Sequence, residues 1–201
     1  MLQQARMIGN RGEGQEALKL AERASSVAPN FLPAILYAVE QALMLGQVTK
    51  AERMILRAWE NTPHPKLAQL FNEIHSDKNV STRIKIFEKL ASCNPENPDT
   101  KLILASGALE AKMWSTARKY LEQALKIRPS VGVYRRLAHL EEAGFKDKEA
   151  ARLWLLKASE AQPEPFWLCQ ECGTPTKDWE LSCNSCGAFD CIEWRQQIGI
   201  K

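Results

Sequence analysis

The sequence predicts an all-α superhelix of about five helix pairs, followed by a small cysteine-rich β module. The first observation is a set of prolines that recur at intervals of 34, 32, 34 and 34 residues, and each ends a similar helical phrase. The second is that five of the six cysteines lie between residues 169 and 191. The predicted domains are therefore residues 1–163 and 164–201. The recurring prolines are Pro29, Pro63, Pro95, Pro129 and Pro163.

Each phrase that leads to a proline has the spacing of one helix face. In the fourth phrase, Ala117, Leu121 and Ala124 stand at i, i+4 and i+7. Small residues at the ends allow a neighbouring helix to approach, and the large middle residue fills the space between them. Proline then ends the helix, because it lacks an N–H group and disfavours helical backbone in the preceding residue. The equivalent residues of the last phrase are Ala151, Leu155 and Ala158.

A second helical phrase precedes each of these, so the chain consists of helix pairs, with an A helix followed by a B helix. Gly12 and Gly46 stand at equivalent points between the two helices of a pair, 34 residues apart. Helix pairs with this period resemble the tetratricopeptide (TPR) repeat over residues 1 to about 163. The third repeat departs most from the TPR pattern, because it is two residues shorter and has Arg83 where Ala is usual.

The register of the repeats places Met1 at about position 4 of the first repeat, so the first repeat is expected to be truncated. We therefore expect a C-terminal piece of a longer protein, with more repeats or a membrane anchor as the alternatives for the missing part. This chain has no apolar run near the roughly 18 residues of a membrane span.

The charge distribution argues against a nucleic-acid partner. The net charge is only +3, and no Lys/Arg cluster gathers on one stretch of the chain. The fold instead predicts other proteins as partners.

The cysteines predict a metal site in the C-terminal module. Cys169/Cys172 and Cys183/Cys186 form two Cys-x-x-Cys pairs that are separated by ten residues. Four thiolates suit tetrahedral Zn²⁺, and because four protein ligands leave no position for water, we expect a structural role. A rubredoxin-like iron site and a pair of disulfides are the alternatives. The predicted fold of residues 164–201 is a zinc-ribbon or rubredoxin-like β module at the C-terminal end of the superhelix.

The aromatic residues of the module are expected to form a small apolar cluster over the metal. The two remaining cysteines are not expected to be ligands. Cys93 at the end of a B helix is expected to be a small buried residue, and Cys191, five residues after the last predicted ligand, a packed or partly exposed thiol. The predicted aromatic cluster is Trp167, Trp179, Phe189 and Trp194.

No catalytic constellation is evident, so we predict that the chain is not an enzyme. The three histidines are far apart in the sequence, and no phosphate-binding glycine loop or hydrolase motif is present. His64 is expected in a turn or helix cap, and His75 and His139 on the surface or in the groove.

TPR arrays bind peptides along the concave face that their A helices line. Position 5 of successive A helices reads Leu36, Ala68, Leu102 and Arg136, so the Lys/Asn/Arg clamp of chaperone adaptors is absent. An apolar groove is expected instead, although some of its leucines are equally consistent with the core. Its candidate residues are Leu36, Leu43, Leu102, Leu109 and Arg136.

Three phrases resemble the C-terminal part of the proteobacterial HemY family: "RAWENTPHPKLAQLF", "MWSTARKYLEQAL" and the stretch from "ARLWLLKASEAQPEPFWLC" to "FDCIEWR". The resemblance implies a scaffold for late heme-pathway enzymes at the cytoplasmic face of the bacterial inner membrane. The alternative is an adaptor of the lipopolysaccharide assembly protein B type, which controls the turnover of a lipid-synthesis enzyme.

Overall fold

The computed structural model describes residues 1–195, which form ten α-helices, a short π-helix and three strands. The A helices are α1 (Leu2–Asn10), α3 (Leu32–Met44), α5 (Pro65–Ile74), α7 (Pro98–Glu110) and α9 (Val131–Leu140). The B helices are α2 (Gly14–Val27), α4 (Val48–Trp59), α6 (Val80–Ser92), α8 (Trp114–Ile127) and α10 (Lys148–Glu160), and the π-helix η1 (Glu141–Phe145) joins α9 to α10. Within this part of the chain, no helix has both the length and the apolar character needed to cross a membrane.

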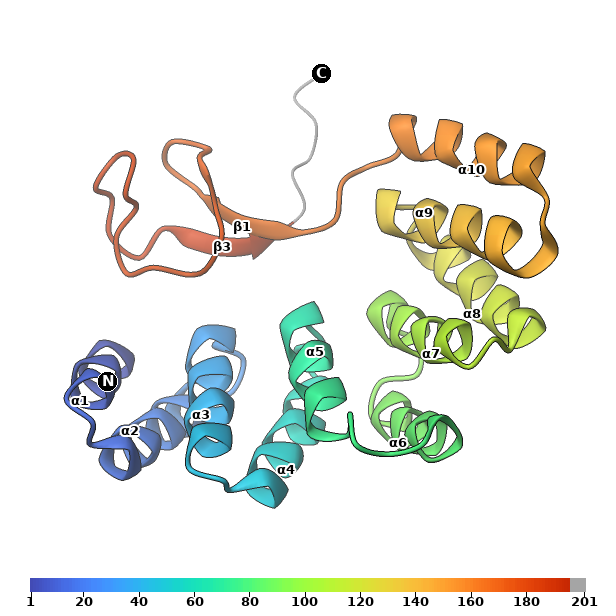
Figure 1. Ribbon diagram of the computed structural model, residues 1–201. Helices are drawn as coiled ribbons and strands as arrows, with labels where there is room; N and C mark the ends of the chain where they lie inside the picture. The colour runs from blue at the N-terminus through green and yellow to red at the C-terminus, as the bar shows by residue number, and fades with distance from the viewer. Residues whose placement is uncertain (196–201) are drawn as a thin grey trace.

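The ten helices follow one another along an arc, as expected for a repeat array (Figure 1). The small and large residues of the B helices are buried as the pattern predicts; Ala117, Leu121 and Ala124 are all 0% exposed. Leu155 is the exception, with 53% of its surface exposed. It lies on α10, and among residues 1–195 no later helix covers this face.

The third repeat is the most open, and Arg83 supplies the reason. At the position where other repeats have a small residue, this side chain donates hydrogen bonds to Asn72 of α5 at 2.5 Å and to Glu110 of α7 at 2.6 Å. A long polar side chain in this place separates α5 from α6, which pack less closely than the helices of the other pairs do.

The turns inside the repeats explain the spaced glycines. Gly12 and Gly46 have φ values of +84° and +69°, in the left-handed region that glycine adopts without strain. Lys112 and Lys146 occupy the equivalent turns of the fourth and fifth repeats with φ values of +56° and +60°. The backbone geometry of the turn is therefore repeated even where the sequence no longer has glycine.

The C-terminal residues form a small antiparallel sheet with the strand order β2-β1-β3. The strands are β1 (Phe166–Cys169), β2 (Pro175–Thr176) and β3 (Ile192–Arg195), and Trp167 pairs with both Thr176 and Trp194. We call residues 164–195 the cysteine module. Residues 196–201 of the predicted C-terminal domain lie outside the described residues.

The cysteine module does not stay at the C-terminal end of the superhelix, which corrects that expectation. After α10 the chain crosses the open side of the arc and packs over α1, α3 and α5 (Figure 1). Trp179 meets Phe31 edge to face at 5.2 Å between ring centroids, and Trp194 meets His64 at 4.1 Å. The physical reason is that Trp167 and Trp179 of the module bury their surface against the first repeats.

The buried residues accordingly form two clusters. The first joins the helices of the first three repeats and the start of the fourth to Trp167, Trp179 and Ile192 of the cysteine module. The second lies within α7, α8 and α9 and includes no residue of the module.

Candidate functional site

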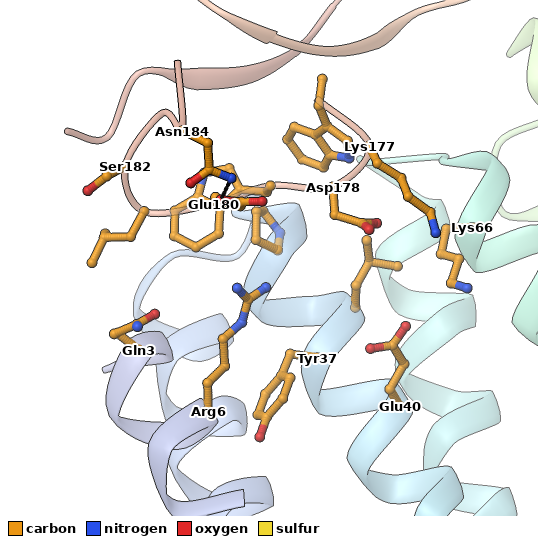
Figure 2. Close-up of a pocket in the computed structure, with 15 residues that line it drawn as sticks. Gln3, Arg6, Tyr37, Glu40, Lys66, Lys177, Asp178, Glu180, Ser182 and Asn184 are labelled. Carbon is orange, nitrogen blue, oxygen red and sulfur yellow. Dashed lines mark hydrogen bonds between the residues drawn. The ribbon is translucent and has the colours of Figure 1, made fainter. Parts of the chain in front are cut away.

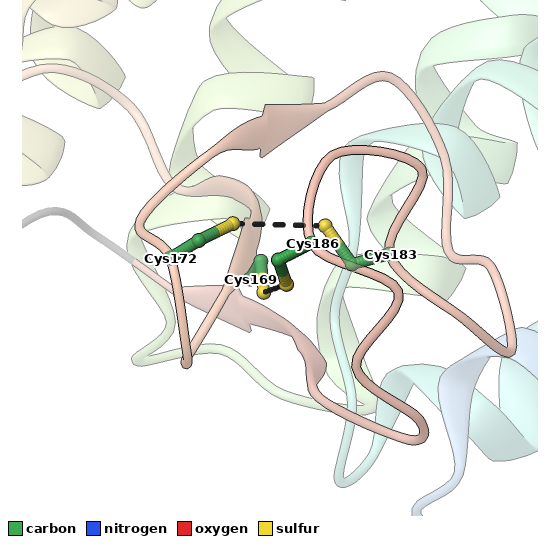
Figure 3. A group of neighbouring side chains, drawn as sticks. All are labelled: Cys169, Cys172, Cys183 and Cys186. Carbon is green, nitrogen blue, oxygen red and sulfur yellow. Dashed lines mark hydrogen bonds between the residues drawn. The ribbon is translucent and has the colours of Figure 1, made fainter.

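The four predicted ligands converge on one point. The Sγ atoms of Cys169, Cys172, Cys183 and Cys186 all lie within 4.8 Å of one another (Figure 3). Cys169 Sγ is 3.7 Å from Cys186 Sγ, and Cys172 Sγ is 3.7 Å from Cys183 Sγ. A tetrahedral site with metal–sulfur bonds of about 2.3 Å has sulfur–sulfur edges of about 3.8 Å. The four thiols are therefore compatible with a metal site.

The two Cys-x-x-Cys segments are built alike. The Cys169 N–H donates to Thr174 O and the Gly173 N–H donates back to Cys169 O, both at 3.0 Å. In the second segment, Cys183 and Gly187 make the same pair of bonds, and Ala188 O accepts in place of Thr174 O. The two glycines have φ values of +69° and +75°, which confirms the expected left-handed turns.

Local hydrogen bonds favour a thiolate at Cys172, whereas the pKa of Cys186 is raised to about 12. Bonds from the side chain and backbone of Thr174 lower the pKa of Cys172 to about 6. Metals bind the deprotonated form of cysteine, so the environment of Cys172 suits ligation.

The two remaining cysteines lie outside the group of four thiols. Cys191 is buried, and its Sγ lies 3.4 Å from Cys169 Sγ and 3.2 Å from Ala188 O. It is the packed thiol that its sequence position predicts. Cys93 is half-buried and caps the C-terminal end of α6, where its Sγ meets Lys89 O.

The aromatic residues of the module do not gather in one cluster as expected. Trp167 and Trp194 pack against each other, with their ring centroids 5.4 Å apart, and face His64 of the superhelix. Trp179 faces Phe31 instead. Phe189 is 69% exposed and packs with none of these three, because its side chain points to solvent beside the second Cys-x-x-Cys turn.

The histidines take three different environments. His64 is the N-cap of α5, where its Nδ1 accepts from the Lys66 N–H at 3.1 Å, which confirms the predicted cap. His75 was expected at the surface or in the groove, but it is buried against Phe71, with 4.9 Å between the ring centroids. His139 is exposed, as expected.

The concave face has an open groove between α5, α7 and α9. It forms a cavity of about 250 Å³ whose apolar lining includes Phe87 and Ile103. Ala68, Leu102 and Arg136, which hold position 5 of their helices, all line it. Leu102 is only 8% exposed and also belongs to the second buried cluster. Of the other candidate groove residues, Leu43 and Leu109 pack against the core and do not line the groove.

A second cavity, of about 820 Å³, lies where the cysteine module covers α1, α3 and α5 (Figure 2). We call it the roofed cavity. Leu36, the remaining candidate groove residue, lines this cavity rather than the open groove. Sequence reasoning missed its polar lining, because those residues are dispersed between positions 3 and 184 and belong to no motif. The polar lining residues are Gln3, Arg6, Tyr37, Glu40, Lys66, Lys177, Asp178, Glu180, Ser182 and Asn184.

Comparison of the whole chain with solved structures supports the repeat architecture. The crystal structure of MamA aligns with a TM-score of 0.50 at 14% identity, over 78% of this chain and 92% of that one. TTC0263, a TPR protein of Thermus thermophilus, aligns with a TM-score of 0.50 at 18% identity, over 80% of this chain and 89% of that one. The fold is therefore a mostly helical, TPR-type array.

The sequence comparisons give one curated relative and no matching protein-family profile. The probable magnetosome protein Mms48 of Magnetospirillum gryphiswaldense is 28% identical over 188 residues, which are 93% of this chain. The chain spans 42% of the length of that relative.

These findings overturn the resemblance to the HemY family. The curated relative is a magnetosome protein, and the structural neighbours are MamA and another TPR protein. The first two quoted phrases consist largely of residues that any TPR helix pair needs for packing, so they do not distinguish one array from another. A role in heme synthesis and a place at the inner membrane have no support in these comparisons.

Proposed function

We propose that this chain is a non-catalytic protein-interaction scaffold that receives a polypeptide segment of a partner in the open groove between α5, α7 and α9. One observation carries the proposal. Residues at the same repeat position on three successive A helices, Ala68, Leu102 and Arg136, line one cavity. Repeat proteins present such concave surfaces to their partners.

The lining indicates what the partner segment would carry. Leu102 and Ile103 supply an apolar floor for an aliphatic or aromatic side chain. Arg136 donates to Gly132 O of its own helix at 3.1 Å and forms no ion pair within residues 1–195. Its remaining guanidinium N–H groups are therefore free to bind an acidic group of the partner.

We further propose that Cys169, Cys172, Cys183 and Cys186 hold one structural Zn²⁺. The close approach of their sulfur atoms, all within 4.8 Å of one another, supports this proposal. The ion would fix two chain segments that have little regular structure of their own, and it would add its binding free energy to the folding of the module.

The open groove can be tested with a displayed library of random peptides. Selection on the wild-type chain should enrich sequences with an apolar residue near an acidic one. Leu102→Arg places a charge on the apolar floor and should weaken the selected peptides about tenfold or more. Leu156→Arg is the matched control, because Leu156 is 61% exposed on α10 and does not line the groove.

Equal binding by the wild type and Leu102→Arg would contradict the groove proposal. So would a library that yields no enriched sequence on the wild-type chain. Circular dichroism of each variant checks that the superhelix is still folded.

A further inference from the structure

The roofed cavity has two walls that come from opposite ends of the chain. One wall consists of side chains from α1, α3 and α5, and the other consists of Trp167 and the segment 177–184 of the cysteine module. Its volume of about 820 Å³ lies within the range of protein ligand sites, roughly 300–1,000 Å³. The cavity exists because the module folds back over the first repeats.

The lining of this cavity carries three positive and three negative side chains. None of the six makes an ion pair with another charged residue within the described part of the chain, although ion pairs occur along the rest of the superhelix. A purely anionic ligand would meet three carboxylates, and a purely cationic one would meet three cations. The balance favours a ligand that carries both charges. The six residues are Arg6, Glu40, Lys66, Lys177, Asp178 and Glu180.

Arg6 is positioned to bind an acidic group of a ligand. Its guanidinium carbon lies 5.4 Å from the ring centroid of Trp179 and 5.9 Å from that of Tyr37. Both distances are within the range of cation–π attraction, so the two rings hold the guanidinium in place. Among residues 1–195 no group accepts a hydrogen bond from this guanidinium. Its fork of donors therefore matches the two oxygens of a carboxylate.

Glu40 and Asp178 offer the complementary anchor for a basic group. Figure 2 shows both carboxylates on the side of the cavity away from Arg6, close to Lys66 and Lys177. Burial raises the pKa of Glu40, and the nearby charge of Lys66 opposes this shift. A cationic side chain that entered here would stabilise both carboxylates.

The position of the cavity indicates a polypeptide rather than a small free molecule. Lys66 of α5 lines the roofed cavity, and its neighbours Pro65 and Ala68 line the open groove. Both cavities therefore border α5, and a polypeptide is a ligand long enough to contact both.

We propose that the roofed cavity binds a peptide segment of a partner protein through one acidic and one basic side chain. The acidic side chain pairs with Arg6, and the basic side chain pairs with Glu40 and Asp178. Leu36 supplies the apolar surface of the same cavity. This proposal deepens the proposed scaffold function and rests on it for the class of ligand.

The cavity is also coupled to the metal site. Its second wall, the segment 177–184, lies between Cys172 of the first Cys-x-x-Cys pair and Cys186 of the second, and contains Cys183. Closing the four-thiol site therefore positions this wall. Because coupling between two binding sites is reciprocal, the peptide and the metal should raise each other's affinity.

The test uses the zinc-loaded chain and four sets of end-blocked eight-residue peptides. The sets carry both charges, acidic residues only, basic residues only, or neither, and binding is measured by fluorescence anisotropy. Peptides with both charges should bind most tightly, and binding should fall when a chelator removes the zinc. Arg6→Gln should weaken binding about tenfold or more, which is the effect expected for losing one charge-assisted pair.

The matched control is Arg23→Gln, because Arg23 is exposed on α2 and lies outside the cavity. Glu40→Gln is the second variant, and it should weaken the peptides with both charges but not those with acidic residues only. Circular dichroism and zinc content confirm that each variant is folded.

The outcomes distinguish peptide binding in the roofed cavity from peptide binding in the open groove. If Arg6→Gln binds as well as Arg23→Gln does, the roofed cavity is not the site and this proposal is overturned. If Leu102→Arg alone abolishes binding, the open groove holds the peptide and only the proposed function stands. If Arg6→Gln and Glu40→Gln weaken binding while Leu102→Arg does not, the cavity proposal holds and the open groove is excluded.

Discussion

His64 lies at the contact between the superhelix and the cysteine module, and this environment keeps its imidazole neutral. The side chain is only 4% exposed and packs against Trp167 and Trp194. Its Nε2 atom is buried and has no hydrogen-bond partner within the described chain. Burial therefore lowers the pKa of His64 to about 4.

This shift predicts a loss of stability in mild acid. Between about pH 6.5 and pH 4, the unfolded chain binds a proton at His64 that the folded chain does not, so stability falls as the pH falls through this window. The contribution is up to about 3 kcal/mol. His64→Asn keeps a capping acceptor for Lys66 but cannot titrate, and urea unfolding at pH 7.5, 5.5 and 4.5 compares the two chains.

The wild type should lose more of its free energy of unfolding across this range than His64→Asn does. Both chains keep His75, whose pKa burial also lowers, so the difference between them isolates His64. Parallel pH profiles of the free energy of unfolding would contradict this prediction, because they would show that folding does not lower the pKa of His64.

At the scale of the element, α10 differs from the other B helices because its core face is half uncovered. Leu155 holds the position of Leu121 in α8, yet it is 53% exposed whereas Leu121 is 0% exposed. The same residue type at the same repeat position therefore has two different environments.

A matched pair of truncations measures this difference. Leu121→Ala removes buried surface and leaves a cavity, so it should cost roughly 2–5 kcal/mol of the free energy of unfolding. Leu155→Ala should cost less than about 1 kcal/mol, because most of its side chain already contacts solvent. Equal losses in urea unfolding would show that another surface covers α10 in solution.

At the scale of the whole molecule, the cysteine module closes the arc onto the first three repeats. It shares one hydrophobic cluster with them and none with α8 and α9. The stability of the first repeats should therefore depend on the metal, and that of the last repeats should not.

Metal removal tests this unequal dependence. One zinc ion per chain is expected from metal analysis, whereas an iron site would colour the protein. In hydrogen exchange, Cys183→Ser should lose the metal and speed exchange in α1, α3 and α5, with little change in α8 and α9. Cys93→Ser is the matched control, because this thiol lies at the end of α6, outside the four-thiol site.

Faster exchange along the whole superhelix would show that all the repeats and the cysteine module unfold as a single cooperative unit. Unchanged exchange in α1, α3 and α5 would show that the module does not stabilise them. The second result would also favour the prediction that residues 1–163 fold as a separate domain.

Most of the repeat architecture could be predicted from the sequence, because the required residue types recur at fixed intervals. Ala117, Leu121 and Ala124 identify the buried face of α8 from spacing alone, and Arg83 marks the repeat that proves most open. The four thiols could be assigned from two matched pairs. The exposure of Leu155 and Phe189 could not be predicted, because it depends on which surfaces other parts of the chain cover.

The sequence by itself therefore determined the helix pairs, their turns and the four-cysteine cluster, since each depends on residues a few positions apart. Only the tertiary structure decided where the cysteine module packs, and with it the roofed cavity that brings Arg6 together with Trp179. The physical reason is that a repeat helix specifies its nearest neighbours through local packing. A contact between the two ends of the chain depends on the curvature of the whole array, which no single repeat encodes.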